Sequence, residues 1–143
     1  MSNPYRWKAK PCEVMGHHKA GLPYDKHKYA SQMEGKLAIL LIKAEIEFIP
    51  HVKFQCFDRK GEPFNYTVDF LFRQPQSLVG ISSLMDFIEI KGALTKHDLL
   101  RKESLEFCHN LNGWIVGSLL LRLWEREGFT KEGTGTSIRK RRF

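Results

Sequence analysis

The sequence predicts an α/β domain in which a small mixed sheet is flanked by helices, with its elements in the order α-β-β-β-α-β-α. Three observations predict this class: apolar residues recur at helical spacing in residues 31–44, a turn joins two strand-like segments between residues 47 and 72, and helical and strand patterns alternate after residue 84. The chain has 143 residues. A single domain of this size buries about 68–70% of its unfolded surface.

Composition divides the chain into three parts. Residues 1–30 form a basic, partly irregular arm, with prolines and glycines between aromatic residues such as Tyr5 and Trp7. Residues 31–127 form the α/β domain. Residues 128–143 form a basic tail that begins with glycine and threonine and that we expect to be mobile.

The positive charge lies at the two ends. The chain carries a formal charge of +7, with six basic and two acidic residues in 1–28 and four basic and no acidic residues in 137–143. The middle of the chain is nearly neutral. Basic ends on a neutral domain indicate a polyanionic partner, most often nucleic acid.

The first helix is predicted over residues 31–44. Ser31-Gln-Met-Glu34 has the form of a capping box, and an apolar face follows it through Leu37 and Leu41. Glu34 lies beside Leu41 at the edge of that face. Its simplest role is therefore that of the capping partner of Ser31.

Two strands are predicted next, over residues 47–57 and 64–72, joined by a turn at 58–63. In the second strand the even-numbered residues are apolar and share one face: Phe64, Tyr66, Val68, Phe70 and Phe72. Asp69 lies on the opposite face with Thr67 and Leu71.

After a polar loop at 73–83, a third strand is predicted over 84–91. A helix capped by Thr95 or Asp98 then runs to about Asn110, a short strand covers 113–117, and a last helix covers 118–127. Five residues are expected on the inner side of the first of these helices: Leu100, Ser104, Phe107, Cys108 and Leu111. Trp114 is expected in the core.

The candidate catalytic residues are Asp69, Glu89 and Lys91. An acidic residue in an apolar strand costs several kcal/mol unless it is paired, hydrated or bound to a metal. The strands at 64–72 and 84–91 are expected to pair, which would bring Asp69 and Glu89 together on one face. Two converging carboxylates suit Mg²⁺, and the carbonyl of Ile90 would add a ligand. Lys91 would position or activate a water, or neutralise a phosphate.

Asp69 followed by Glu89-Ile-Lys91 resembles the PD-(D/E)xK nuclease superfamily, and Glu34 resembles the acidic residue that many members carry on the first helix. The resemblance covers about residues 29–117. It is nearest to small single-domain members: Holliday-junction resolvases, phage endonucleases, phage head-completion nucleases and the end-cleaving nuclease of some transposons. It departs from the family at Val68, where members carry proline.

The resemblance implies a restriction-endonuclease-like core and a Mg²⁺-dependent DNA endonuclease, directed by DNA structure, in which Mn²⁺ can replace Mg²⁺. Asp69, Glu89 and Glu34 would be catalytic metal ligands and Lys91 the catalytic lysine. It also implies a homodimer or a larger nucleoprotein assembly. A non-catalytic DNA-binding or phage assembly protein on the same scaffold, and a nuclease acting on RNA, are the alternatives.

Basic residues outside this motif are candidates for phosphate contact or, in the simpler interpretation, for a solvated surface. They are Arg6, Lys8 and Lys10 in the arm, Lys96, Arg101 and Lys102 at the start of the second helix, and Arg139, Lys140, Arg141 and Arg142 in the tail.

Cysteine and histidine suggest two weaker sites. Cys12, His17 and His18 allow a zinc hypothesis, although the segment has no second cysteine. Cys108-His109 allows a nucleophile pair, but core packing of Cys108 is the preferred interpretation. An odd number of cysteines, three, favours a reducing compartment. Because no targeting signal or membrane span is evident either, we expect a cytoplasmic location.

Overall fold

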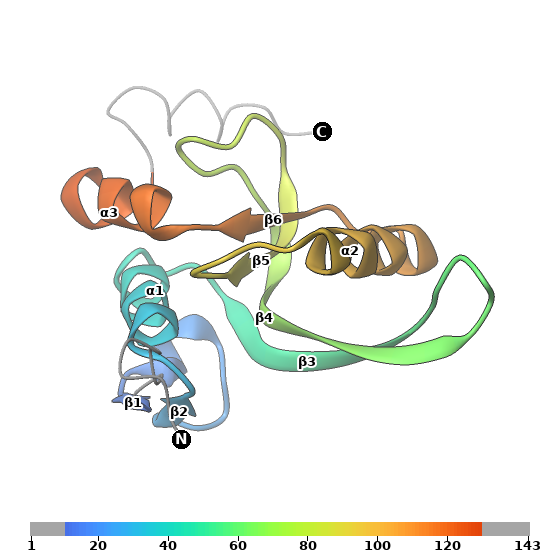
Figure 1. The fold of residues 1–143 in the computed structure, drawn as a ribbon. Helices are drawn as coiled ribbons and strands as arrows, with labels where there is room; N and C mark the ends of the chain where they lie inside the picture. The colour runs from blue at the N-terminus through green and yellow to red at the C-terminus, as the bar shows by residue number, and fades with distance from the viewer. Residues whose placement is uncertain (1–10, 130–143) are drawn as a thin grey trace, which may run out of the picture.

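A computed structural model of the protein describes residues 11–129 (Figure 1). The predicted mixed α/β class is confirmed. None of the helices in this range is both long and apolar enough to cross a membrane.

The centre of the molecule is a four-stranded sheet in the order β3-β4-β5-β6. Its strands are β3 (Phe48–Phe57), β4 (Pro63–Gln76), β5 (Met85–Ile90) and β6 (Gly113–Val116). The first three run antiparallel, whereas β6 runs parallel to β5. A parallel neighbour requires a crossover, and helix α2 (Lys96–His109) provides it.

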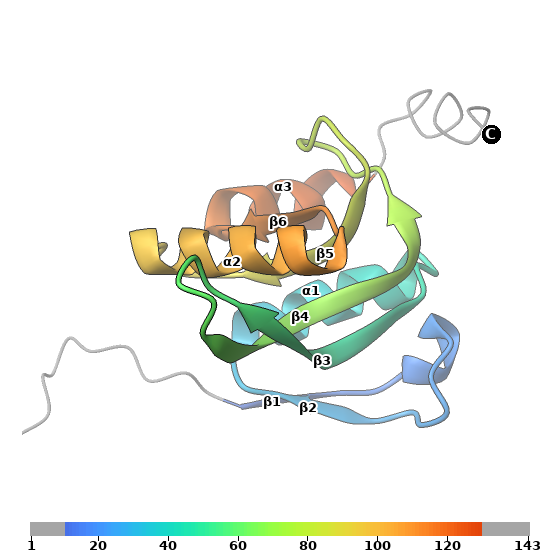
Figure 2. The same cartoon turned by 90° about the vertical axis from the view of Figure 1, so that its right-hand side faces the viewer.

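Helices lie on both sides of this sheet (Figure 2). Helix α1 (Gln32–Lys43) and helix α3 (Ser118–Glu127) contribute to the larger apolar core together with strand residues such as Phe70 and Ile88. Helix α2 covers a smaller core, formed around Leu105 and Phe87. The sheet is therefore the middle of three layers.

The N-terminal segment, expected as a partly irregular arm, contains regular elements that the predicted element order did not include. Strand β1 (Cys12–Val14), a 3-10 helix η1 (His17–Ala20) and strand β2 (His27–Tyr29) form a two-stranded antiparallel unit beside α1. The element order of the chain therefore differs from the predicted one, although the elements of residues 32–127 are of the predicted types. Strands of three residues are too short to give a periodic signal. Their stability comes from packing, since Val14 and Tyr29 are buried in the larger core.

Strand β4 passes from one core to the other along its length. Tyr66 and Val68 belong to the smaller core under α2, whereas Phe70 belongs to the larger one, although the three residues have the same parity. Asp69 lies at this crossing. On the neighbouring strand, His51 has a positive φ of 56°, which is uncommon for a residue other than glycine. The expectation of one common face for the even-numbered residues of β4 is therefore wrong beyond Val68, because the sheet turns there.

Helix α2 also presents a different side to the sheet from the one expected. Leu105 is its buried residue, while Phe107 is 89% exposed and Cys108 is exposed. Polar partners explain the rotation: Arg101 donates to the Asn65 carbonyl and lies over the Phe64 ring, both on β4. The placement of Phe107 and Cys108 on the inner side is thus wrong.

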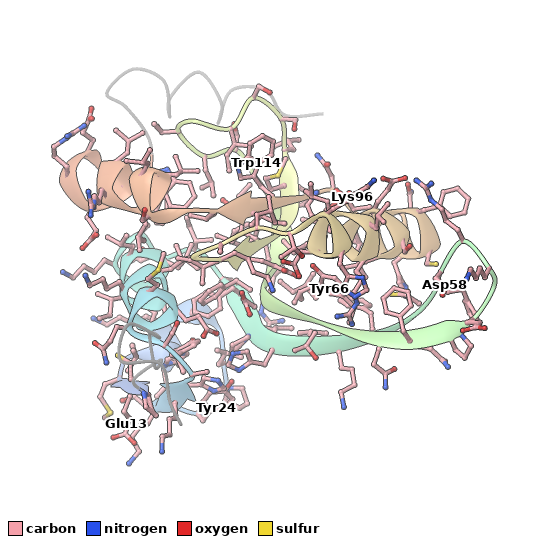
Figure 3. The ribbon with its side chains drawn as sticks, viewed as in Figure 1. Glu13, Tyr24, Asp58, Tyr66, Lys96 and Trp114 are labelled. Atoms are coloured by element: carbon pink, nitrogen blue, oxygen red, sulfur yellow. The ribbon has the colours of Figure 1, made fainter. Side chains whose placement is uncertain are left out.

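Trp114 is likewise not a core residue. It lies on β6, the edge strand of the sheet, and is 41% exposed (Figure 3). An edge strand with a solvated outer face allows an aromatic residue to remain partly exposed.

Candidate metal centre

Asp69 lies on β4, which pairs with β3 on one side and with β5 on the other. The pairing of Phe70 with Pro50 on β3 and with Ile88 on β5 defines the register on both sides. Continued by one residue, it sets Asp69 between His51 and Glu89. The Asp69 carboxylate accepts a hydrogen bond from the Ile90 backbone N–H at 2.9 Å. Asp69 and Glu89 are therefore neighbours, as the predicted strand pairing requires.

A second group of ligand atoms surrounds Asp69 on the side of α1. Glu34, His51 and Asp69 each offer one ligand atom, and these atoms all lie within 4.8 Å of one another. It is the one such group of three among residues 11–129. Two carboxylates and an imidazole from a helix and two strands can hold a divalent cation.

Each carboxylate oxygen of Glu34 has its own partner. Oε2 accepts the Ser31 hydroxyl at 3.0 Å, and Oε1 lies 3.2 Å from His51 Nε2. Ser31 also caps α1 by accepting the Glu34 N–H. Glu34 therefore contacts its capping residue and faces the candidate centre at the same time.

A second histidine, His27, contacts His51 at the ring nitrogen that does not face Glu34. His51 Nδ1 lies 3.0 Å from His27 Nε2, on β2. Beside this pair, buried His17 bonds the Tyr29 hydroxyl at 2.7 Å. The N-terminal hairpin therefore supplies the packing behind His51.

Glu89 lies on the other side of Asp69, toward α2. It is only 3% exposed, and its Oε1 has no hydrogen-bond partner. It lines an open pocket, and the other lining residues are Tyr66, Thr67, Lys91, Asp98 and Arg101. In Figure 3 Tyr66 lies between β4 and α2. Burying a carboxylate oxygen without a hydrogen-bond partner costs free energy, so this atom requires an explanation.

Burial controls the ionisation of both strand carboxylates. It raises the pKa of Asp69 to about 6, against the hydrogen bond from Ile90, and the charge of Glu34 adds to the rise. Burial also raises the pKa of Glu89 to about 7, where Tyr66 and Lys91 oppose the rise and Asp69 adds to it. Two carboxyl groups with raised pKa values on neighbouring strands, one of them in a pocket, are typical of functional centres.

In the neighbouring pair, the pKa values of His51 and Glu34 shift in opposite directions. The hydrogen bond to Glu34 raises the pKa of His51 in spite of burial. Burial tends to raise the pKa of Glu34, but the hydrogen bonds from His51 and Ser31 lower it overall. The pair therefore favours a protonated imidazole beside an ionised carboxylate when no cation is present.

Lys91 lies at the mouth of the pocket and pairs with Asp98 at 3.6 Å. Asp98 also completes the capping box of α2 with Thr95. Ile90 contributes its backbone N–H to Asp69, and a ligand role for its carbonyl stays a prediction.

The predicted phosphate-contacting residues of α2 have different surroundings. Lys102 is largely buried and pairs with Glu106 at 3.1 Å. Arg101 lines the pocket while its guanidinium lies over Phe64 and Tyr66. Lys96 is exposed on the first turn of the helix. Only Arg101 of the three therefore reaches the pocket wall. The basic residues predicted in the arm and the tail lie outside the described residues, and they are Arg6, Lys8, Lys10, Arg139, Lys140, Arg141 and Arg142.

The two weaker cysteine and histidine hypotheses find little support in the described residues. Cys12, His17 and His18 form no group of three ligands in residues 11–129. His17 is instead buried against Tyr29. Cys108 contacts the backbone of Phe57, and the neighbouring His109 bonds the Gln55 carbonyl.

Comparison of the chain with protein-family models, with curated proteins and with solved structures finds no match.

His51 is the one member of the cluster that the sequence did not indicate. It stands in a strand after Pro50, and the sequence around it carries no ligand spacing. A signal emerges only from the register, which sets it opposite Asp69, and from its positive φ. Backbone strain of this kind collects at functional sites.

Proposed function

We propose that this protein is a metal-dependent nuclease with a restriction-endonuclease-like core, acting on DNA. The observation that carries the proposal is the position of Glu89. Its Oε1 is buried without a partner, and the residue lines a pocket with Lys91, one strand away from Asp69. Asp69 in turn adjoins Glu34 and His51.

The residues present fit a divalent cation. Asp69 on β4 has Glu34 of α1 within ligand distance on one side and Glu89 of the neighbouring strand β5 on the other, and no described basic residue pairs with Glu89. Oxygen ligands of this type suit Mg²⁺ and Mn²⁺. Asp69, Glu34 and Glu89 would hold the ion. When bound, it would polarise a phosphate and lower the pKa of a water molecule.

Lys91 and Arg101 supply the positive charge that a phosphodiester requires. Lys91 is partly exposed beside Glu89, and its partner Asp98 lies at the accessible start of α2. A phosphate oxygen entering the pocket competes with Asp98 for the ammonium group. Lys91 would then orient the attacking water or stabilise charge that develops on the phosphate. Arg101 on the pocket wall would hold an adjacent phosphate.

The proposal that DNA is the substrate rests on the distribution of charge along the sequence. The positive charge is concentrated in residues 1–28 and 137–143, on either side of a nearly neutral domain. Such ends supply affinity for phosphates that does not depend on base sequence and that weakens as salt increases. Selectivity would then come from the structure of the DNA.

A cleavage assay tests the proposal. The full chain is incubated with Mg²⁺ or Mn²⁺ and three substrates: supercoiled plasmid, linear duplex and a four-way junction. We expect cutting that EDTA stops and that Lys91→Ala reduces by roughly 100-fold or more. Lys60→Ala, which removes an exposed charge at the β3–β4 turn, is the matched control and should cut normally.

Binding is measured in EDTA by gel shift on the same substrates. Retained binding by Lys91→Ala together with lost cutting supports a catalytic role. Absence of cutting of all three substrates with either ion, in spite of tight binding, would overturn the nuclease proposal and favour a DNA-binding or assembly protein.

A further inference from the structure

We infer that His51 is a nitrogen ligand of the metal centre and that it makes the centre selective for Mn²⁺ over Mg²⁺. The inference deepens the proposed function and rests on it for the role of the ion. The chemistry is direct: Mg²⁺ is a hard ion that is reluctant to exchange its oxygen ligands, whereas first-row transition ions accept imidazole readily.

Donor spacing is the first support. His51 Nε2 and Glu34 Oε1 lie 3.2 Å apart, and the donors of Glu34, His51 and Asp69 all lie within 4.8 Å of one another. On one octahedral ion with bonds near 2.1 Å, adjacent donors lie about 3 Å apart and opposite donors about 4.2 Å apart. The His51–Glu34 separation is therefore that of adjacent donors on one ion, and the 4.8 Å bound on the other two is close to the separation of opposite donors.

The backbone at His51 is the second support. Its φ of 56° interrupts an otherwise extended strand, and the regular pairing of β3 with β4 is interrupted at the His51–Asp69 position. A non-glycine residue is uncommon in this conformation. This distortion accompanies an imidazole that lies against Glu34 on α1.

His27 is the third and independent support. A metal-bound imidazole nearly always donates its remaining N–H to a fixed acceptor. With Nε2 on the ion, the proton of His51 resides on Nδ1, and His27 Nε2 lies 3.0 Å away to accept it. His27 in turn lies against the rings of His17 and Tyr29, which hold it in place.

The preferred substitution is His51→Asn. Asparagine tolerates a positive φ better than most residues, so the strand geometry is preserved. Its amide offers an oxygen in place of the imidazole nitrogen. The matched control is His18→Asn, which changes an exposed histidine outside the cluster.

The experiment measures Mn²⁺ binding to the full chain without DNA. Electron paramagnetic resonance gives the free Mn²⁺ concentration, competition with Mg²⁺ gives the ratio of the two affinities, and electron spin echo modulation detects a ¹⁴N nucleus bonded to the ion. We expect ¹⁴N modulation in the wild type and in His18→Asn. In His51→Asn the modulation should vanish, with the Mn²⁺ affinity at least 10-fold lower and the Mg²⁺ affinity changed by less than about 3-fold.

The wild-type spectrum alone can overturn the inference. Bound Mn²⁺ without ¹⁴N modulation, or equal losses of Mn²⁺ and Mg²⁺ affinity in a folded His51→Asn variant, would exclude His51 as a selective ligand. The two proposals fail separately. DNA cleavage with no ¹⁴N signal leaves the nuclease and removes the ligand, whereas a ¹⁴N signal with no cleavage leaves the ligand and removes the nuclease.

Discussion

The Asp69 carboxylate accepts a hydrogen bond from the backbone N–H of Ile90 at 2.9 Å, joining β4 to β5 one residue after Glu89. This bond holds one carboxylate of the candidate centre against the strand that carries the other. It also leaves the second oxygen of Asp69 available to a cation. A backbone donor is independent of side-chain rotamers, so the position of Asp69 is well defined before any ligand binds.

Asp69→Asn separates this structural bond from metal binding. The amide oxygen of asparagine can still accept from Ile90, while the negative charge is lost. We expect a folded protein with unchanged DNA binding in EDTA and cleavage reduced to background. Circular dichroism, gel shift and the plasmid assay measure the three properties. Unfolding of the variant, or cleavage at the wild-type rate, would contradict this assignment.

The contribution of Asp69 and Glu89 to the stability of the metal-free protein should fall as the pH rises. An acid whose pKa is higher in the folded state than in the unfolded state stabilises the fold below its unfolded pKa and loses that contribution as the pH rises through the folded pKa. Burial raises the pKa of Asp69 from 3.8 to about 6 and that of Glu89 from 4.5 to about 7. The loss therefore extends from about pH 4 to pH 7.

Glu89→Gln isolates the contribution of one group. Thermal unfolding in EDTA at pH 5 and pH 8 should show a smaller decrease in melting temperature for this variant than for the wild type. Each kcal/mol corresponds to roughly 2–4 °C for a chain of this size. Glu62→Gln, at the exposed β3–β4 turn, is the control and should behave as the wild type does. Identical decreases in all three proteins would rule out a titrating Glu89.

His27 should act as a positioning residue for His51. His27→Ala removes the group that lies 3.0 Å from His51 Nδ1, and we expect Mn²⁺ affinity to fall by about 10–100-fold. His27→Gln offers an amide oxygen at a similar reach and should restore part of the affinity. Mn²⁺ titration followed by electron paramagnetic resonance measures both. An Ala variant that binds Mn²⁺ as the wild type does would show that the 3.0 Å contact has no role in binding.

The orientation of α2 can be tested through its apolar residues. Leu105 is fully buried, so Leu105→Ala should cost about 2–5 kcal/mol in the free energy of unfolding. Phe107 is 89% exposed, and Phe107→Ala should change that free energy by no more than about 0.5 kcal/mol. Urea unfolding measures both. A large cost at Phe107 would mean that the helix presents the face that amphipathicity predicted.

Periodicity predicted the central elements well. The helix expected over 31–44 is α1, and the strand expected over 84–91 is β5. The pairing of β4 with β5, which makes Asp69 and Glu89 neighbours, also follows from the order of the segments. These features depend on local patterns and on a short connection, which the sequence contains directly.

Other features were decided by contacts between residues far apart in the chain. The side of α2 that faces the sheet depends on Arg101 meeting Asn65, and the short β1–β2 unit depends on packing beside α1. The sequence by itself therefore determined which carboxylates and which lysine stand near one another in the sheet. Only the tertiary structure brought His51 to Glu34 and Asp69, because an unusual backbone angle and the crossing of β4 between two cores leave no periodic trace in the sequence.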